Sequence, residues 1–155
     1  MSSVSEFVEE PRFSADFMPD FLQPMGELRR ATIVIAEDDP AMRRLLMVAL
    51  HKEGYRVVEA KDGTELQDAL QEGGDTSEID LVISDIQMPG RSGMEVLDEL
   101  RKTDWVTPMI LITAFGDEET HLDAHLLGAA TILDKPFDLE DLRFAVHSII
   151  PRSVM

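Results

Sequence analysis

Four positions in this sequence carry residue types suited to phosphoryl chemistry, and each stands at the end of a short apolar run. They are the acidic pair Glu37-Asp38, the single carboxylate Asp85, the hydroxyl of Thr113 and the ammonium group of Lys135. Parallel α/β sheets build their sites at the carboxyl ends of the strands. If the runs are such strands, the four positions meet at one edge of a sheet and can hold a cation and a phosphoryl group.

The carboxylates of Glu37, Asp38 and Asp85 would form a pocket of concentrated negative charge. Such a pocket is costly unless a cation neutralises it or one carboxyl group keeps its proton. A set of oxygen ligands suits a hard ion, so Mg²⁺ is the predicted cofactor. Lys135 offers a positive charge, and Thr113 a hydroxyl donor, to a phosphoryl oxygen. Asp85 is then a nucleophile of the aspartyl-phosphate kind.

Each of these residues, taken singly, has an ordinary explanation. An aspartate at the end of a strand is usually a turn or cap residue, and Asp39 is predicted to be one. Thr113 alone would be a strand threonine, Lys135 a surface lysine, and the pair Glu37-Asp38 part of a solvated loop. Four such positions in order, at the same end of four predicted strands, favour a shared site.

The elements that must position these residues follow from the alternation of two patterns. Five short β-branched runs occur at 32–36, 56–60, 80–84, 108–113 and 130–134. Stretches of amphipathic helix are predicted between and after them, including a fourth at about 117–127. The first helix is expected to begin at Pro40 after its cap Asp39 and to end before Gly54, and Asp138 is expected to cap the fifth. This order predicts an α/β fold, with a parallel sheet covered by helices on both faces.

The motifs around the four positions together resemble the receiver domain of two-component response regulators. The resemblance covers about residues 31–151. It rests on Ile33-Val34-Ile35-Ala36-Glu37-Asp38-Asp39-Pro40, Asp80-Leu81-Val82-Ile83-Ser84-Asp85-Ile86-Gln87-Met88-Pro89-Gly90, Leu111-Ile112-Thr113-Ala114-Phe115-Gly116 and Leu133-Asp134-Lys135-Pro136-Phe137. It implies the flavodoxin-like receiver fold, a five-stranded parallel sheet of order 2-1-3-4-5 with five helices on both faces.

The resemblance also implies a role for each site residue. Asp85 would be the phospho-acceptor. Asp38 would hold Mg²⁺ directly and Glu37 through water, with further ligation from Asp85 and the backbone carbonyl of Gln87. Thr113 would bond the phosphoryl group and shift inward, and Lys135 would pair with a phosphoryl oxygen. The Lys135-Pro136 peptide bond is expected to be cis.

The same resemblance implies a signalling protein rather than an enzyme, although one that assists its own phosphorylation and dephosphorylation. The donor would be a phosphohistidine on a sensor histidine kinase or a histidine phosphotransfer domain. The output partner would bind the surface formed by residues about 117–150, and members of the family often form homodimers through this surface.

Three features depart from the family pattern or are particular to this chain. Ile132 stands where the family often has a tyrosine or phenylalanine that turns inward as a switch. Phe115, two residues beyond Thr113, is predicted either to slow hydrolysis of the acyl phosphate or only to pack against its loop. His121 and His125 have the spacing of a metal-binding pair but are predicted to be simply exposed.

Composition limits the classes of function. The chain has 155 residues, of which 44% are hydrophobic, which suits a single core. A net charge of -17 argues against direct binding of nucleic acid or of an anionic membrane surface. There is no cysteine, no signal peptide and no run of about 20 apolar residues, so a cytoplasmic location is expected.

The predicted organisation has three parts. Residues 1–30 form an extension rich in proline and phenylalanine, either a disordered tail or a docking arm. Residues 31–151 form the receiver domain, and residues 152–155 form a short tail. A loop longer than usual is expected at about 71–78.

Several alternatives to a phosphorylated stand-alone receiver remain open at this point. The chain could be a receiver fragment of a larger transcription regulator, or a receiver fold that binds proteins without phosphorylation. A phosphatase of the haloacid dehalogenase type would need a second acid where Gln87 stands. A nucleotide-binding domain would need a glycine-rich turn where Glu37 begins the first loop.

Overall fold

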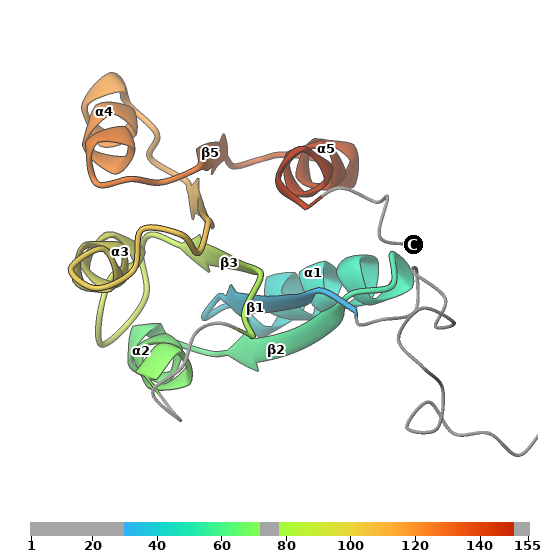
Figure 1. Ribbon diagram of the computed structural model, residues 1–155. Coiled ribbons are helices and arrows are strands. Elements are labelled where there is room, and N and C mark those ends of the chain that lie inside the picture. Colours follow the sequence, from blue (N-terminus) through green and yellow to red (C-terminus); the bar gives the residue numbers. More distant parts are fainter. Residues whose placement is uncertain (1–29, 72–77, 151–155) are drawn as a thin grey trace, which may run out of the picture. The chain divides into compact units, whose positions relative to one another are not determined.

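The computed structural model describes residues 30–71 and 78–150. The predictions for the N-terminal extension at 1–30, for the C-terminal tail and for most of the loop at 71–78 lie outside these residues. The described residues form strands and helices that alternate along the chain (Figure 1). The elements are β1 (Thr32–Ala36), α1 (Pro40–Lys52), β2 (Arg56–Ala60), α2 (Gly63–Gln71), β3 (Leu81–Asp85), α3 (Gly93–Leu100), β4 (Met109–Thr113), α4 (Glu118–Leu126), β5 (Thr131–Asp134) and α5 (Leu139–Ile149).

The strands form one parallel sheet in the order β2-β1-β3-β4-β5, which confirms the predicted fold class and topology. The register aligns the carboxyl ends of neighbouring strands. Ala36 lies opposite Ser84, Asp85 opposite Ile112, and Thr113 opposite Asp134. Side chains at the ends of β1, β3, β4 and β5 therefore gather along one edge.

Each face of the sheet has its own hydrophobic core, because successive strand residues point to opposite faces. Ile33 and Ile35 pack with α1 and α5, whereas Val34 and Ala36 pack with α2, α3 and α4. Figure 1 shows the two groups of helices on opposite sides of the sheet. Strands buried on both faces appear in sequence as continuous apolar runs, which is why they could be recognised.

Helix ends follow the predicted capping residues. The side chain of Asp39 accepts a hydrogen bond from the backbone N–H of Ala41, and Pro40 is the first residue of α1. Gly54, just past the end of α1, has a φ of 98°, a conformation that glycine adopts without strain. Asp138 caps α5. Asp39 and Asp138 therefore fix where α1 and α5 begin, next to the edge that carries the four site positions.

Helix α4 differs from the prediction. It was expected to be amphipathic, but Ala124 is its one buried residue, and Leu122 and Leu126 are exposed. The reason is its neighbour. Strand β5 ends the sheet and is itself only partly buried, so α4 has little apolar surface to pack against. No helix in the described part of the chain is long and apolar enough to cross a bilayer.

Candidate functional site

Three carboxylates converge at the carboxyl ends of β1 and β3. Glu37 follows β1 and is 1% exposed, Asp85 ends β3 and is 5% exposed, and Asp38 is exposed to solvent. One oxygen from each lies within 4.8 Å of the others. The strands are neighbours in the sheet, so the convergence follows directly from the topology. This confirms that the predicted acidic residues share one location.

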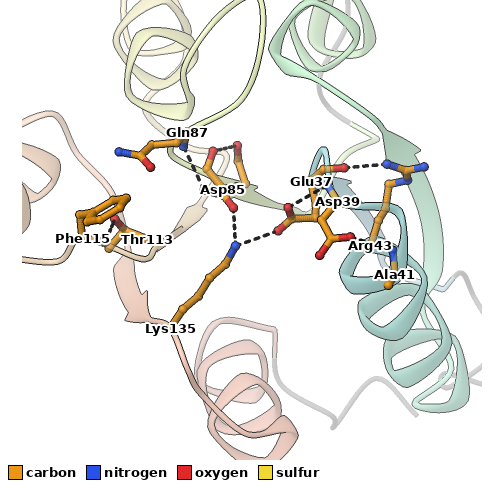
Figure 2. A network of polar contacts seen from close by, with 10 residues as sticks. Glu37, Asp39, Ala41, Arg43, Asp85, Gln87, Thr113, Phe115 and Lys135 are labelled. Carbon is orange, nitrogen blue, oxygen red and sulfur yellow. Dashed lines mark hydrogen bonds and ion pairs between the residues drawn. The ribbon is translucent and has the colours of Figure 1, made fainter.

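Lys135 joins this cluster from the other side. Its Nζ lies 2.6 Å from Asp85 Oδ2 and 3.4 Å from Glu37 Oε1 (Figure 2). Burial alone would lower the lysine pKa, but the hydrogen bond and charge of Asp85, aided by Glu37, outweigh it, and the net pKa is raised. The side chain therefore stays protonated between the two buried carboxylates. The Lys135-Pro136 peptide bond is cis, as expected.

The Asp85 carboxylate is held in one orientation by groups on both of its oxygens. Oδ1 accepts a hydrogen bond of 2.9 Å from the backbone N–H of Gln87, and Oδ2 meets Lys135. The following backbone is also fixed: Ser84 Oγ donates to the Asp85 carbonyl, and a Cβ added to Gly93 would lie 2.5 Å from that carbonyl oxygen. The carboxylate is thus preorganised, as reacting groups must be.

The buried carboxyl group of Glu37 has a raised pKa. Its burial, with a contribution from the charge of Asp85, raises its pKa to about 7, although the backbone N–H of Asp39 and the charge of Lys135 act in the opposite direction. Glu37 in the metal-free protein therefore holds its proton to a higher pH than a free glutamate does. A bound cation would favour the ionised form.

This raised pKa predicts how the metal-free protein responds to pH. Because the folded Glu37 binds its proton more tightly than an unfolded glutamate with a pKa of 4.5, its contribution to stability is full at lower pH and is lost as the pH rises from 4.5 to about 7. In the presence of chelator, we expect the urea concentration at the midpoint of unfolding to fall as the pH rises through this range. The Glu37→Gln variant should lack the part of this fall that is due to Glu37. An unchanged pH profile in the variant would contradict the assignment.

Thr113 lies at the same edge but has a different partner. It is buried, and its Oγ1 accepts a hydrogen bond of 3.0 Å from the backbone N–H of Phe115. By strand alternation it shares a face with Leu111, on the side of α2, α3 and α4. Glu37, Asp38, Asp85 and Lys135 thus form a connected group, and Thr113 lies beside it. Phe115 is 67% exposed, which does not favour its packing against the loop.

The contacts of two residues near the site were not predicted from the sequence. Arg43, one turn beyond the cap of α1, donates from Nη1 to the Glu37 carbonyl (2.8 Å) and from Nε to Glu59 Oε1 (2.9 Å). His121 was predicted to be simply exposed, but it pairs with Asp134, which directly precedes Lys135. The only hint of the Arg43 contact in the sequence is that a basic residue stands early in the first helix, close to Glu37. Nothing in the spacing of His121 and Asp134 indicated their contact.

A comparison with known families identifies the chain. A sequence profile described as the response regulator receiver domain matches residues 33–147.

The chain belongs to this family.

Curated relatives and a solved structure agree with the family assignment. The chain is 43% identical over 126 residues to the uncharacterized transcriptional regulatory protein YkoG of Bacillus subtilis, covering 79% of this chain and 52% of YkoG. It is 33% identical over 119 residues to sporulation initiation phosphotransferase F of the same organism, covering 77% and 93%. A receiver domain from Clostridium thermocellum has a TM-score of 0.72 at 31% identity, covering 79% and 96%.

These matches establish the class of domain. Residues 33–147 form a receiver domain of the two-component type, a module whose switching is based on phosphorylation, and the phosphatase and nucleotide-binding alternatives are not favoured. The chain spans about half the length of YkoG and almost all of sporulation initiation phosphotransferase F. Receiver domains generally bind Mg²⁺ at an acidic pocket and interact with histidine kinases or phosphotransfer proteins. The acidic cluster of this receiver domain has the matching chemistry.

Proposed function

We propose that Asp85 accepts a phosphoryl group from a phosphohistidine donor in a Mg²⁺-dependent reaction, and that the resulting change alters partner binding. The observation that carries this proposal is the contact of 2.6 Å between Lys135 Nζ and Asp85 Oδ2 inside the acidic cluster. A buried carboxylate with a fixed orientation and a cation beside it can act as a nucleophile and then as the anchor of a charged adduct.

The residues present fit a magnesium ion. All the donors are oxygens, and the carboxylates of Glu37, Asp38 and Asp85 approach within 4.8 Å. Burial, together with the charge of Asp85, raises the pKa of Glu37, and a divalent cation would favour the ionised carboxylate. The ion would be held by these three residues and by the backbone carbonyl of Gln87. When bound, it would neutralise negative charge on the transferring phosphoryl group.

Transfer would proceed by attack of an Asp85 carboxylate oxygen on phosphorus. The bond from phosphorus to the donor histidine nitrogen breaks, and that nitrogen keeps the electron pair. Asp85 loses its own charge on becoming an acyl phosphate, so Lys135 would transfer its pairing from the carboxylate to a phosphoryl oxygen. The Thr113 hydroxyl now accepts from Phe115, which leaves its proton free to be donated to the same group. We also propose that this chemistry lets the protein assist its own phosphorylation and dephosphorylation.

The partners follow from the same proposal. The donor would be a sensor histidine kinase or a histidine phosphotransfer domain, and the protein would act in the cytoplasm. The output surface would be formed by residues about 117–150, where Leu122, Leu126 and Phe144 are exposed. Exposed apolar residues are common at protein interfaces, and a homodimer is one arrangement that this surface could serve. We propose residues 31–151 as the extent of the receiver domain.

The experiment that tests the function is the intact mass of the protein after incubation with acetyl phosphate. One added phosphoryl group is expected with Mg²⁺ and none with chelator. A phosphorylated histidine phosphotransfer domain, with the same two conditions, serves as a second donor. If neither donor gives an adduct, the chain is instead a receiver fold that binds its partners constitutively.

Phe115 is expected to prolong the life of the phosphorylated state. Its exposed ring follows Thr113 by two residues, so it can restrict the approach of water to an acyl phosphate on Asp85. The Phe115→Ala variant should lose its phosphoryl group roughly two- to tenfold faster, since tenfold corresponds to about 1.4 kcal/mol of barrier. The measurement is the decay of the phosphorylated mass after donor removal. Phe144→Ala, which removes an exposed ring from α5, is the control, and equal decay in both variants would contradict the role.

A further inference from the structure

The position of α4 depends on polar contacts more than on the hydrophobic core. Ala124 is the buried residue of this helix. A short helix gains most of its stability from packing an apolar face, and α4 has almost none to pack. Contacts at its two ends must therefore determine where it lies against β5.

At its N-terminal half, α4 is held by His121. The Nε2 atom of this residue lies 2.9 Å from Asp134 Oδ1 and 3.1 Å from Oδ2, and the two side chains are 39% and 51% exposed. Gly116 in the β4–α4 loop lies directly against the pair. A Cβ added there would collide with the Asp134 carboxylate and lie 2.9 Å from His121 Nε2. We call His121, Asp134 and Gly116 the α4 bridge, because they join α4, the end of β5 and the loop after β4.

The other end of α4 is held by a buried arginine. Arg101, at the end of α3, donates from Nη2 to the Gly128 carbonyl (3.0 Å) and from Nη1 to the Asp104 carbonyl (2.9 Å), and is itself buried. The guanidinium carbon of Arg101 lies over the Trp105 ring, 5.5 Å from the ring centroid. A Cβ added to Gly128 would lie 2.8 Å from the same ring. The C-terminal end of the helix is thus held by a buried arginine, and its N-terminal half depends on the exposed contact between His121 and Asp134.

The α4 bridge is continuous with the phosphoryl site. Asp134 directly precedes Lys135, which contacts Asp85, and Gly116 is three residues beyond Thr113. We propose that the bridge is the positioning element that couples Lys135 and Thr113 to α4, and that it opens when these two residues engage a phosphoryl group. The C-terminal end of α4 would stay on Arg101 while the N-terminal half is released. This inference rests on the function proposed for Asp85.

One physical point supports this coupling. An exposed polar contact of this kind changes the equilibrium constant between its closed and open states by only about two- to fivefold. A weak contact of this size suits a switch between two states of similar free energy, which small changes at the site can bias.

Hydrogen exchange of the α4 amides tests the coupling. In the unphosphorylated wild type we expect residues 118–126 to be protected, and phosphorylation to accelerate their exchange roughly two- to fivefold. His121→Gln and Asp134→Asn should each show the accelerated exchange without phosphorylation. The double variant should equal either single variant, because both act through one contact. Gly116→Ala keeps both His121 and Asp134 but pushes the Asp134 carboxylate aside. This variant should also show the accelerated exchange without phosphorylation.

His125→Gln is the matched control. It removes the second histidine of the same helix, one turn further on, and should exchange like the wild type. If His121→Gln also exchanges like the wild type, the bridge does not hold α4 and the inference is overturned. The intact mass, read on the same samples, separates the two proposals. An adduct with unchanged α4 exchange overturns the coupling alone, and an absent adduct overturns the proposed function.

Discussion

Replacing Asp85 with asparagine is expected to abolish phosphoryl uptake and leave the domain folded. The amide has the shape of the carboxylate but is not a nucleophile towards phosphorus, so the adduct should be lost entirely. The effect on stability should be small, within about 1 kcal/mol, because two changes oppose each other. The ion pair with Lys135 is lost, but repulsion with Glu37 is relieved, and Lys135 keeps Glu37 as a partner at 3.4 Å.

The measurement is intact mass after incubation with acetyl phosphate and Mg²⁺, together with urea denaturation in chelator. Asp98→Asn, which alters an exposed aspartate on α3, is the matched control and should take up one phosphoryl group like the wild type. An adduct on the Asp85→Asn protein would mean that another residue is the acceptor, and the assignment of Asp85 would be wrong.

Among the substitutions proposed here, Lys135→Met is expected to lower the stability of the metal-free protein the most. Methionine keeps the length of the side chain but removes its charge, which leaves the buried carboxylates of Asp85 and Glu37 without their cation. Breaking a partly buried pair in this way should lower the free energy of unfolding by about 2 kcal/mol. Mg²⁺ should recover part of the loss, since it can neutralise the same carboxylates.

The control is Lys102→Met, which removes a lysine whose pairing with Glu99 at 3.2 Å is on the surface. Exposed pairs contribute little, so this variant should lose less than about 0.5 kcal/mol. Urea denaturation of both variants, with chelator and with Mg²⁺, gives the comparison. If the two losses are equal, Lys135 is an ordinary surface lysine and the electrostatic account of the cluster is wrong.

Much of the fold could be predicted because its signals are local. The buried strands are runs of β-branched and other apolar residues, and β1 and β2 have the predicted bounds while β3, β4 and β5 differ by about one residue. Asp39 and Asp138 cap helices through hydrogen bonds within a few residues, which sequence spacing reveals. The amphipathic α4 was predicted wrongly, because amphipathic spacing does not show how much sheet surface is available next to an edge strand.

The sequence by itself determined which residues gather at the site, since parallel strands bring their carboxyl ends to one edge whatever the details of packing. Glu37, Asp38, Asp85 and Lys135 needed no further information to be placed together. The tertiary structure alone decided how they interact: that Lys135 lies between two carboxylates, that burial raises the pKa of Glu37, and that Thr113 accepts from Phe115. It also decided the His121–Asp134 contact. Distances and burial arise from chain segments far apart in sequence, and no local pattern encodes them.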